Sequence, residues 1–158
     1  MMRGILAANA LRNRKVYVAD SFAGLPPPNP ECYPADTGDS LHTFRELAIP
    51  LEQVRANFAR YDLLDDDVVF LQGLFQDTLP LLKAERFALL RLDGDMYEST
   101  IVALTNLYPR LSPGGFVIID DYGAIEACRK AVTDYRINMG ISAEFHPIDW
   151  TGAWWQKQ

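Results

Sequence analysis

Two short apolar runs that end in aspartates constrain the fold of this chain more than any other feature. The runs are Phe87–Leu92 and Phe116–Ile119. Their length and the turn residues that bound them are typical of buried strands in a parallel sheet, and ligands gather outside the carboxyl ends of such strands. The aspartates that follow the two runs are Asp93, Asp95, Asp120 and Asp121. Four carboxylates brought together repel one another unless a cation or protons neutralise them, so the pattern predicts a divalent-metal site.

Helical and strand patterns alternate along the 158 residues, which is typical of βαβ units. Besides the two runs, strands are predicted at Lys15–Ala19 and Asp67–Gln72, with an antiparallel pair from Ile141–His146 and Ala153–Gln156. Helices are predicted at Arg3–Leu11, Leu51–Tyr61, Ser99–Leu111 and Ile125–Met139, with a short helix or turn at Leu79–Ala84 and a turn at Ser112–Gly115. We therefore expect residues 1–158 to form a single α/β domain with a mostly parallel sheet.

The charge balance indicates which partners the protein binds. A net charge of -6 and a sequence pI near 4.8 argue against a nucleic-acid-binding surface, because no stripe of Lys and Arg is present to neutralise phosphates. No apolar stretch approaches the roughly 20 residues that span a bilayer, and the N-terminus lacks the pattern of a signal peptide. We expect a cytoplasmic protein with a small-molecule partner, no nucleic acid and no membrane, and two free thiols at Cys32 and Cys128.

The aspartates at the strand ends allow more than one interpretation. Asp20 follows the first strand, where nucleotide-binding α/β folds place an acid that accepts hydrogen bonds from ribose hydroxyls, but it can equally be a cap or turn residue. Asp93, Asp120 and Asp121 offer hard oxygen ligands that suit Mg²⁺, Ca²⁺ or Mn²⁺, or they can cap the helices that follow. Asp95 lies beyond the strand, where it can reach a substrate and act as a general base.

The histidines and tryptophans carry weaker signals. His42 can belong to a lid over a substrate or to a solvated loop, and the second interpretation is preferred. His146 is interpreted as structural. Trp150, Trp154 and Trp155 are expected to cover the sheet or an oligomer contact.

Four stretches carry a resemblance to a known family, and they lie at residues 18–26, 73–80, 91–100 and 111–122. In order and spacing they resemble the macrocin O-methyltransferase family, from about Met2 to Trp155. The resemblance implies a Rossmann-like class I methyltransferase sheet with helices on both faces and an antiparallel strand near the C-terminus. It also implies an enzyme that uses S-adenosylmethionine and Mg²⁺ to methylate a sugar hydroxyl of a glycoside such as a macrolide or aminocoumarin in antibiotic biosynthesis.

The resemblance also assigns roles to individual residues. It makes Asp93, Asp120 and Asp121 the magnesium ligands and Asp95 the catalytic base. The residues that it places at the cofactor are Asp20, Ser21, Gly73, Phe75 and Asp77. For Phe75, a core position and an adenine contact are equally good interpretations, and Gly73 can serve a tight turn.

One departure from the family concerns its first strand and Gly-rich turn, which precede the helix with which this sequence begins. In the family that strand lies between the Lys15 strand and the Phe87 strand, so the chain is expected to be an N-terminally truncated domain. It is expected to close the gap, to borrow a strand from a second copy, or to keep exposed strand edges and associate, and a homo-oligomer is the expected state. Three functions stay open: the O-methyltransferase, a non-catalytic metal- or ligand-binding fragment, and a phosphate or nucleotide-sugar enzyme with an Asp-x-Asp metal motif. The last requires Arg91 or Arg129 to hold phosphate.

Overall fold

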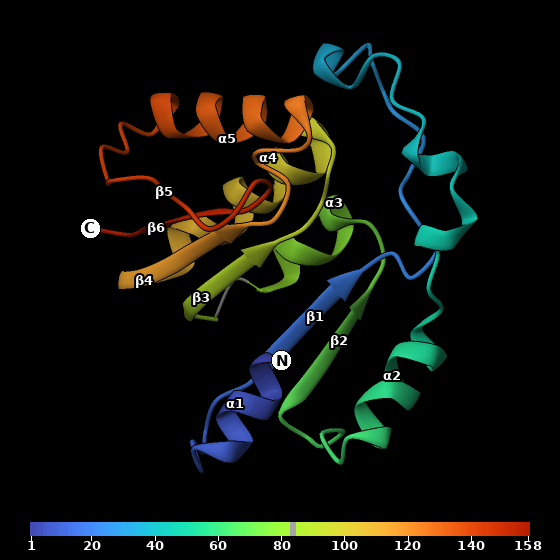
Figure 1. Cartoon of the computed structure of the whole chain (residues 1–158), viewed down its shortest axis with the longest axis vertical. Coiled ribbons are helices and arrows are strands. Elements are labelled where there is room, and N and C mark those ends of the chain that lie inside the picture. The colour runs from blue at the N-terminus through green and yellow to red at the C-terminus, as the bar shows by residue number, and fades with distance from the viewer. Residues whose placement is uncertain (83–84) are drawn as a thin grey trace. The chain divides into compact units, whose positions relative to one another are not determined.

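The chain divides into two compact units (Figure 1). The computed structural model describes residues 1–82 and 85–158. The first unit contains residues 1–26 and 41–78, and the second contains residues 27–40 and 79–158. The end of the predicted Leu79–Ala84 segment lies outside the described residues, and Leu79–Leu82 forms a 3-10 turn. In the described part of the chain, no helix has the length and apolar character to cross a membrane.

The first unit is built on a two-stranded parallel sheet. Its elements are α1 (Met2–Ala8), β1 (Val16–Asp20), α2 (Leu51–Arg60), β2 (Val68–Gln72) and α3 (Phe75–Thr78), with 3-10 turns at Leu41–Thr43 and Arg45–Leu47. The strands pair from Val16 opposite Val68 to Asp20 opposite Gln72. Phe70 of β2 contacts Phe58 of α2, with ring centroids 5.6 Å apart, and Phe22 after β1, at 6.4 Å. Two strands alone form a marginal sheet, so these aromatic contacts with α2 and the residue after β1 add to its packing.

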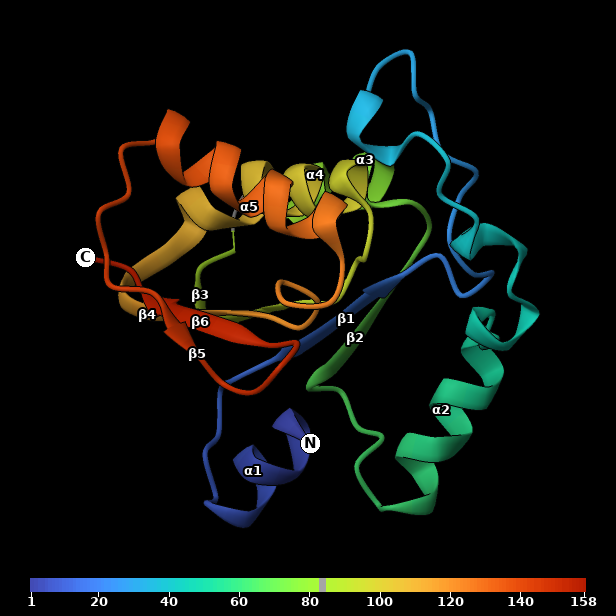
Figure 2. The same ribbon diagram turned by 45° about the horizontal axis from the view of Figure 1, so that its top comes forward.

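The second unit holds a four-stranded sheet and most of the buried core. Its strands are β3 (Phe87–Leu92), β4 (Leu111–Ile119), β5 (His146–Pro147) and β6 (Ala153–Gln156), and its helices are α4 (Tyr97–Leu107) and α5 (Glu126–Asn138), with 3-10 turns at Pro34–Asp36 and Tyr108–Arg110. The strand order is β3-β4-β6-β5, with β3 parallel to β4 and β6 antiparallel to both β4 and β5. Figure 2 shows α4 and α5 side by side over one face of this sheet.

Apolar side chains from the strands and the two helices close this core. Leu90 and Leu92 of β3 are buried, as the period-2 alternation of a strand requires. Val117 and Ile119 of β4 are fully buried, and so is Trp155 of β6. From the helices, the buried residues include Ala103, Leu104, Ala131 and Val132. The apolar positions therefore fix which face of β3 and β4 turns inward, and with it the register of the two strands.

The structure confirms the predicted α/β class, with a parallel β3–β4 pair and antiparallel strands at the C-terminus. The prediction of a turn at Ser112–Gly115 is wrong, because these residues lie inside β4. Leu111 pairs with Phe87 and Phe116 with Leu89, so the extra residues form a bulge within the strand. The backbone at Gly114 and Gly115 also exchanges hydrogen bonds of 2.8 Å with Lys157, which holds the segment in the sheet.

Three smaller differences concern helices. The first turn of α4 begins at Tyr97, two residues before the prediction, and its last predicted residue, Leu111, begins β4. The short helix α3 was not predicted. The other predicted helices and strands are present within a few residues, apart from the Ile141–His146 strand, of which only His146 belongs to β5.

Helix α4 is capped from a distant part of the sequence. Asp36, only 1% exposed, accepts hydrogen bonds from the backbone N–H groups of Tyr97 at 2.7 Å and Glu98 at 3.0 Å. These are the first donors of the helix, which otherwise have no intrahelical acceptor, and a carboxylate also interacts favourably with the N-terminal end of the helix dipole. Asp36 thus ties the segment 27–40 to the start of α4, which follows the turn that carries Asp93 and Asp95.

We expect Asp36→Ala to lower the free energy of unfolding by about 2 kcal/mol, because the mutation removes a buried carboxylate and leaves two part-buried N–H groups without their acceptor. Urea denaturation measures the change. Glu31→Ala, which removes an exposed carboxylate from the same segment, is the matched control and should change stability by less than about 0.5 kcal/mol. Equal effects of the two substitutions would contradict the capping role.

Candidate active site

The parallel pairing of β3 and β4 brings the acidic motifs together. Leu92 and Ile119 are register partners, so Asp93 and Asp120 each follow directly after a paired residue. The Asp120 N–H also donates a hydrogen bond of 3.0 Å to the Leu92 carbonyl oxygen, which continues the ladder beyond the strand ends. The predicted convergence of these aspartates at the carboxyl ends of the strands is therefore confirmed.

The carboxylates of this cluster perturb one another. Burial raises the pKa of Asp93 to about 6, with Asp120 and Asp121 as further causes. Burial also raises the pKa of Asp121 to about 6, followed by repulsion from Asp95 and Asp120. The Oδ2 atom of Asp121 is buried and has no hydrogen-bond partner among the described residues. The cluster thus has more negative charge than its surroundings compensate.

Asp95 lies in a strained part of the turn between β3 and α4. Its φ of 55° is in the left-handed region, which non-glycine residues seldom adopt and which often marks functional sites. Burial raises the pKa of Asp95, and the charges of Asp93 and Asp39 raise it further. Asp95 and Asp121 act on each other's pKa, so Asp95 belongs to the same electrostatic cluster.

Arg91 is the cation of the cluster. Its guanidinium binds both carboxylate oxygens of Asp120, with 3.0 Å between Nε and Oδ1, and its Nη2 lies 3.5 Å from Oδ2 of Asp93. Within residues 1–82 and 85–158, no three side chains of His, Cys, Asp or Glu are arranged so that they could hold a metal ion. Both carboxylate oxygens of Asp120 are bound by Arg91. In this arrangement the aspartates therefore bind the Arg91 guanidinium.

Sequence reasoning did not find this role of Arg91. Arg91 lies two positions before Asp93, so both residues face the same side of the extended chain, and this spacing was the available signal. The alternative that assigned phosphate binding to Arg91 or Arg129 loses support. Arg91 is engaged by Asp120, and Arg129 donates to the backbone carbonyl oxygens of Tyr122 and Gly123 at 3.1 Å each.

The residues predicted to bind the cofactor lie in the first unit, at the carboxyl ends of β1 and β2. Oδ1 of Asp20 accepts a hydrogen bond of 2.6 Å from the Phe22 N–H, so Asp20 has the turn role that was its alternative interpretation. Ser21 donates through Oγ to the Gly24 carbonyl oxygen at 2.6 Å. Gly73, with φ of 140°, donates its N–H to the Asp20 carbonyl oxygen at 3.0 Å. The structure therefore brings Asp20 and Gly73 together, and their cofactor roles stay predictions.

Phe75 and Asp77 lie on α3, which follows the Gly73 turn. Phe75 is half-buried and Asp77 is exposed, so neither the core position nor the adenine contact of Phe75 is favoured. There is little room for a side chain at Gly73, because a Cβ there would lie 3.0 Å from Cγ2 of Thr78. A residue with a side chain at position 73 would therefore press against α3.

The aromatic and histidine residues separate into buried and exposed groups. His146 stacks on Trp154 with ring centroids 4.4 Å apart, which agrees with a structural role, and His42 is exposed. Trp155 is fully buried and covers the sheet as predicted. Trp150 differs from both other tryptophans, because its side chain is 82% exposed.

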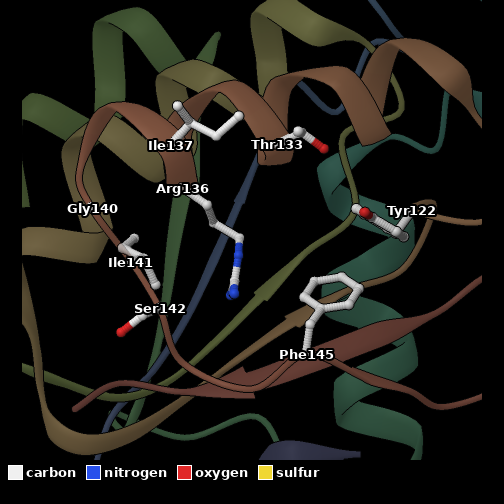
Figure 3. Close-up of a pocket in the computed structure, with 8 residues that line it drawn as sticks. All are labelled: Tyr122, Thr133, Arg136, Ile137, Gly140, Ile141, Ser142 and Phe145. Carbon is white, nitrogen blue, oxygen red and sulfur yellow. The ribbon is translucent and has the colours of Figure 1, made fainter.

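A cavity of about 380 Å³ lies beside the residue that follows Asp121 (Figure 3). Tyr122, Phe145 and the C-terminal part of α5 line it. The Arg136 guanidinium lies 5.2 Å from the Phe145 ring centroid and 5.0 Å from that of Trp155, and Nη2 donates to the Ala143 carbonyl oxygen at 2.5 Å. These contacts fasten α5 to the sheet, so Arg136 has a structural role in the wall of the cavity.

The raised pKa values predict how stability changes with pH when metal is absent. The folded chain holds Asp93 and Asp121 at a pKa of about 6, against an ordinary value of 3.8, so it binds more protons than the unfolded chain between these values. Their stabilising contribution is complete below pH 3.8 and is lost as pH rises through 6. In EDTA, we expect the free energy of unfolding to be higher at about pH 5.5 than at about pH 7.5.

Urea denaturation at the two pH values measures the difference. Asp121→Asn should flatten it and stabilise the protein at the higher pH, whereas Asp66→Asn, at an exposed aspartate, should leave it unchanged. The same pH difference in wild type and Asp121→Asn would contradict the electrostatic account.

Comparison with known proteins identifies the family. The model of the family described as Macrocin-O-methyltransferase (TylF) matches residues 1–157. The 8-demethyl-8-(2,3-dimethoxy-alpha-L-rhamnosyl)-tetracenomycin-C 4'-O-methyltransferase of Streptomyces olivaceus is 57% identical over 98% of this chain and 59% of its own length. The mycinamicin III 3''-O-methyltransferase of Micromonospora griseorubida is 51% identical over 98% of this chain and 62% of its own. The chain thus spans about three fifths of these relatives.

Solved structures agree with the sequence comparison. The O-methyltransferase NovP superimposes with a TM-score of 0.96 at 49% identity, covering 99% of this chain and 65% of NovP. The calicheamicin methyltransferase CalS11 shares the fold, with a TM-score of 0.74 at 20% identity over 98% of this chain and 65% of its own. The predicted class I methyltransferase fold is confirmed, and the chain belongs to the macrocin-O-methyltransferase (TylF) family.

Proposed function

We propose that this protein is a Mg²⁺- and S-adenosylmethionine-dependent O-methyltransferase that acts on a sugar hydroxyl of a natural-product glycoside. The observation that carries the proposal is the cluster of Asp93, Asp95, Asp120 and Asp121 at the ends of β3 and β4, in a chain of a methyltransferase family. The relatives support the acceptor class, since one is named for a rhamnosyl 4'-O position and another for a 3''-O position of mycinamicin III.

The chemistry of the aspartates fits Mg²⁺. Asp93, Asp120 and Asp121 would hold the ion, because carboxylate oxygens are hard ligands and Asp121 has a buried oxygen without a hydrogen-bond partner among the described residues. A bound Mg²⁺ would supply Lewis acidity that lowers the pKa of a nearby hydroxyl. The guanidinium of Arg91 competes for the same oxygens, so it would have to leave Asp120 when the ion binds.

Asp95 would take the proton of the acceptor hydroxyl. Its raised pKa makes its carboxylate a stronger base than an ordinary exposed aspartate, which suits proton removal. The Asp36 cap on α4 holds the residues that follow Asp95, whose own backbone has the left-handed conformation. Asp95 would therefore meet the hydroxyl from a preorganised position.

S-adenosylmethionine would supply a methyl group on a sulfonium, which needs positioning more than activation. We propose that Asp20, Ser21, Gly73, Phe75 and Asp77 contact this cofactor from the ends of β1 and β2. Asp20 would have to give up its bond to the Phe22 N–H or share it with a ribose hydroxyl. The homo-oligomer and the cytoplasmic location stay predictions.

One observation favours a second candidate function. Because Arg91 neutralises Asp120 and no metal-binding triplet is preformed in the described residues, the chain can be a ligand-binding member of the family that does not transfer methyl groups. Binding experiments separate the two candidates.

We expect S-adenosylmethionine to bind the full chain in calorimetric titrations, and to bind in the presence and absence of Mg²⁺, because the proposed cofactor residues and metal ligands are different side chains. The methylated sugar, followed by mass spectrometry, should form only when Mg²⁺ is present. A folded chain that binds no S-adenosylmethionine would refute the enzymatic proposal and leave the ligand-binding candidate.

The aspartates and Arg91 should have separable effects. Asp93→Ala should abolish Mg²⁺ binding in calorimetry, whereas Asp95→Asn should keep Mg²⁺ binding and lower methyl transfer by about 10²-fold or more, as expected for a lost general base. Arg91→Met is the matched variant within the cluster, and it should tighten Mg²⁺ binding because it frees Asp120. Normal turnover of both aspartate variants would show that these roles are wrong.

A further inference from the structure

We propose that Trp150 is the stacking platform for the sugar ring of the acceptor, and so a specificity-determining residue of this site. The inference rests on the proposed sugar substrate. Trp150 lies in the loop of residues 148–152, which connects β5 to β6. Its side chain is 82% exposed, whereas Trp155 on β6 is fully buried and Trp154 packs between Phe116 and His146.

The loop that carries Trp150 is held rigidly by its own hydrogen bonds. Oδ1 of Asp149 accepts from the N–H of Thr151 at 2.9 Å, from its Oγ1 at 3.1 Å, and from the N–H of Gly152 at 2.7 Å. The Ile148 N–H donates to the Gly152 carbonyl oxygen at 2.8 Å and closes the loop. These bonds to its charged form lower the pKa of Asp149. The backbone that carries the indole therefore needs little further ordering when a ligand binds.

The same loop lies against the segment that follows Asp120 and Asp121. Strand β6 runs antiparallel to β4 with Ala153 opposite Ile119, so the residues before Ala153 run beside those after Ile119. The Gly123 N–H donates to the Thr151 carbonyl oxygen at 2.6 Å. A Cβ at Gly123 would lie 2.1 Å from the Trp150 carbonyl oxygen, so only glycine allows this approach. Two backbone contacts thus hold the backbone of Trp150 beside Gly123, which follows Asp121 by two residues.

A sugar ring is the ligand that this arrangement suits. One face of a deoxysugar or hexose ring presents C–H groups, which pack on the flat indole by dispersion, while its hydroxyl groups point outward. Carboxylates such as those that follow β3 and β4 are hydrogen-bond acceptors for those hydroxyls. A solvent-exposed indole, on a loop whose backbone lies beside the segment that follows Asp121, therefore matches the mixed apolar and hydroxylated surface of a sugar better than it matches a wholly apolar aglycone.

The test measures sugar binding and needs no turnover. Methyl α-L-rhamnopyranoside is titrated into the full chain with Mg²⁺, and its dissociation constant is followed by saturation-transfer NMR, with 4-nitrophenol as an aglycone-like probe. Trp150→Ala should weaken binding of the rhamnoside about 10-fold and Trp150→Phe about 3-fold, because phenyl keeps part of the stacking face. Ile148→Ala, at a 53% exposed residue of the same loop, is the matched control and should stay within about 2-fold.

Several results would overturn the inference: no binding of the rhamnoside to wild type, equal affinities of wild type and Trp150→Ala, equal losses in Trp150→Ala and Ile148→Ala, or a loss confined to 4-nitrophenol. Methyl transfer is assayed separately. There Trp150→Ala should raise KM with little change in kcat, because the indole touches no reacting atom. Trp150-dependent sugar binding without any methyl transfer would refute the proposed function and support the inference.

Discussion

The parallel pairing of β3 with β4 is the interaction on which the candidate site depends. The buried alternation of Leu90 and Leu92 against Val117 and Ile119 fixes the register, and a slip by one residue would turn these side chains outward. The same register places two acidic motifs at one edge of the sheet, where burial and mutual repulsion raise pKa values. The apolar packing of β3 and β4 thus holds the aspartates close together, although their charges repel one another.

The clustered aspartates require positive charge nearby to offset their mutual repulsion. Arg91 supplies it from the strand itself, and its planar guanidinium matches both oxygens of Asp120. A divalent ion would supply more charge from a smaller volume and would leave oxygens free for a substrate. Whether the chain only binds a ligand or also catalyses methyl transfer can therefore depend on which cation binds Asp120. The two competitors are the Arg91 guanidinium and a divalent ion from solution.

Much of the fold and part of the site could be predicted from local patterns. Phe87–Leu92 is a strand as predicted. It could be recognised because the apolar run marks the strand and the turn residues at its end mark where it stops. The prediction of a turn at Ser112–Gly115 was wrong for a long-range reason. Backbone hydrogen bonds with Lys157 hold this sequence, which is typical of a turn, in β4. The Asp36 cap was also beyond prediction, because 61 positions separate Asp36 from the N–H of Tyr97. Local chemistry indicated the carboxylates, whereas the Asp36 cap and the pairing of Arg91 with Asp120 join segments that are far apart in the sequence.

The segment of residues 27–40 has a consequence for how the chain can be divided. It leaves the first unit, contributes Asp36 to the second, and returns to the first at Leu41. Neither unit is therefore one continuous stretch of gene, and a chimera that exchanged residues 1–78 with a relative would also exchange the helix cap of the recipient's acidic turn. In such a chimera, the cap on α4 forms only where the exchanged piece brings a carboxylate in the place of Asp36.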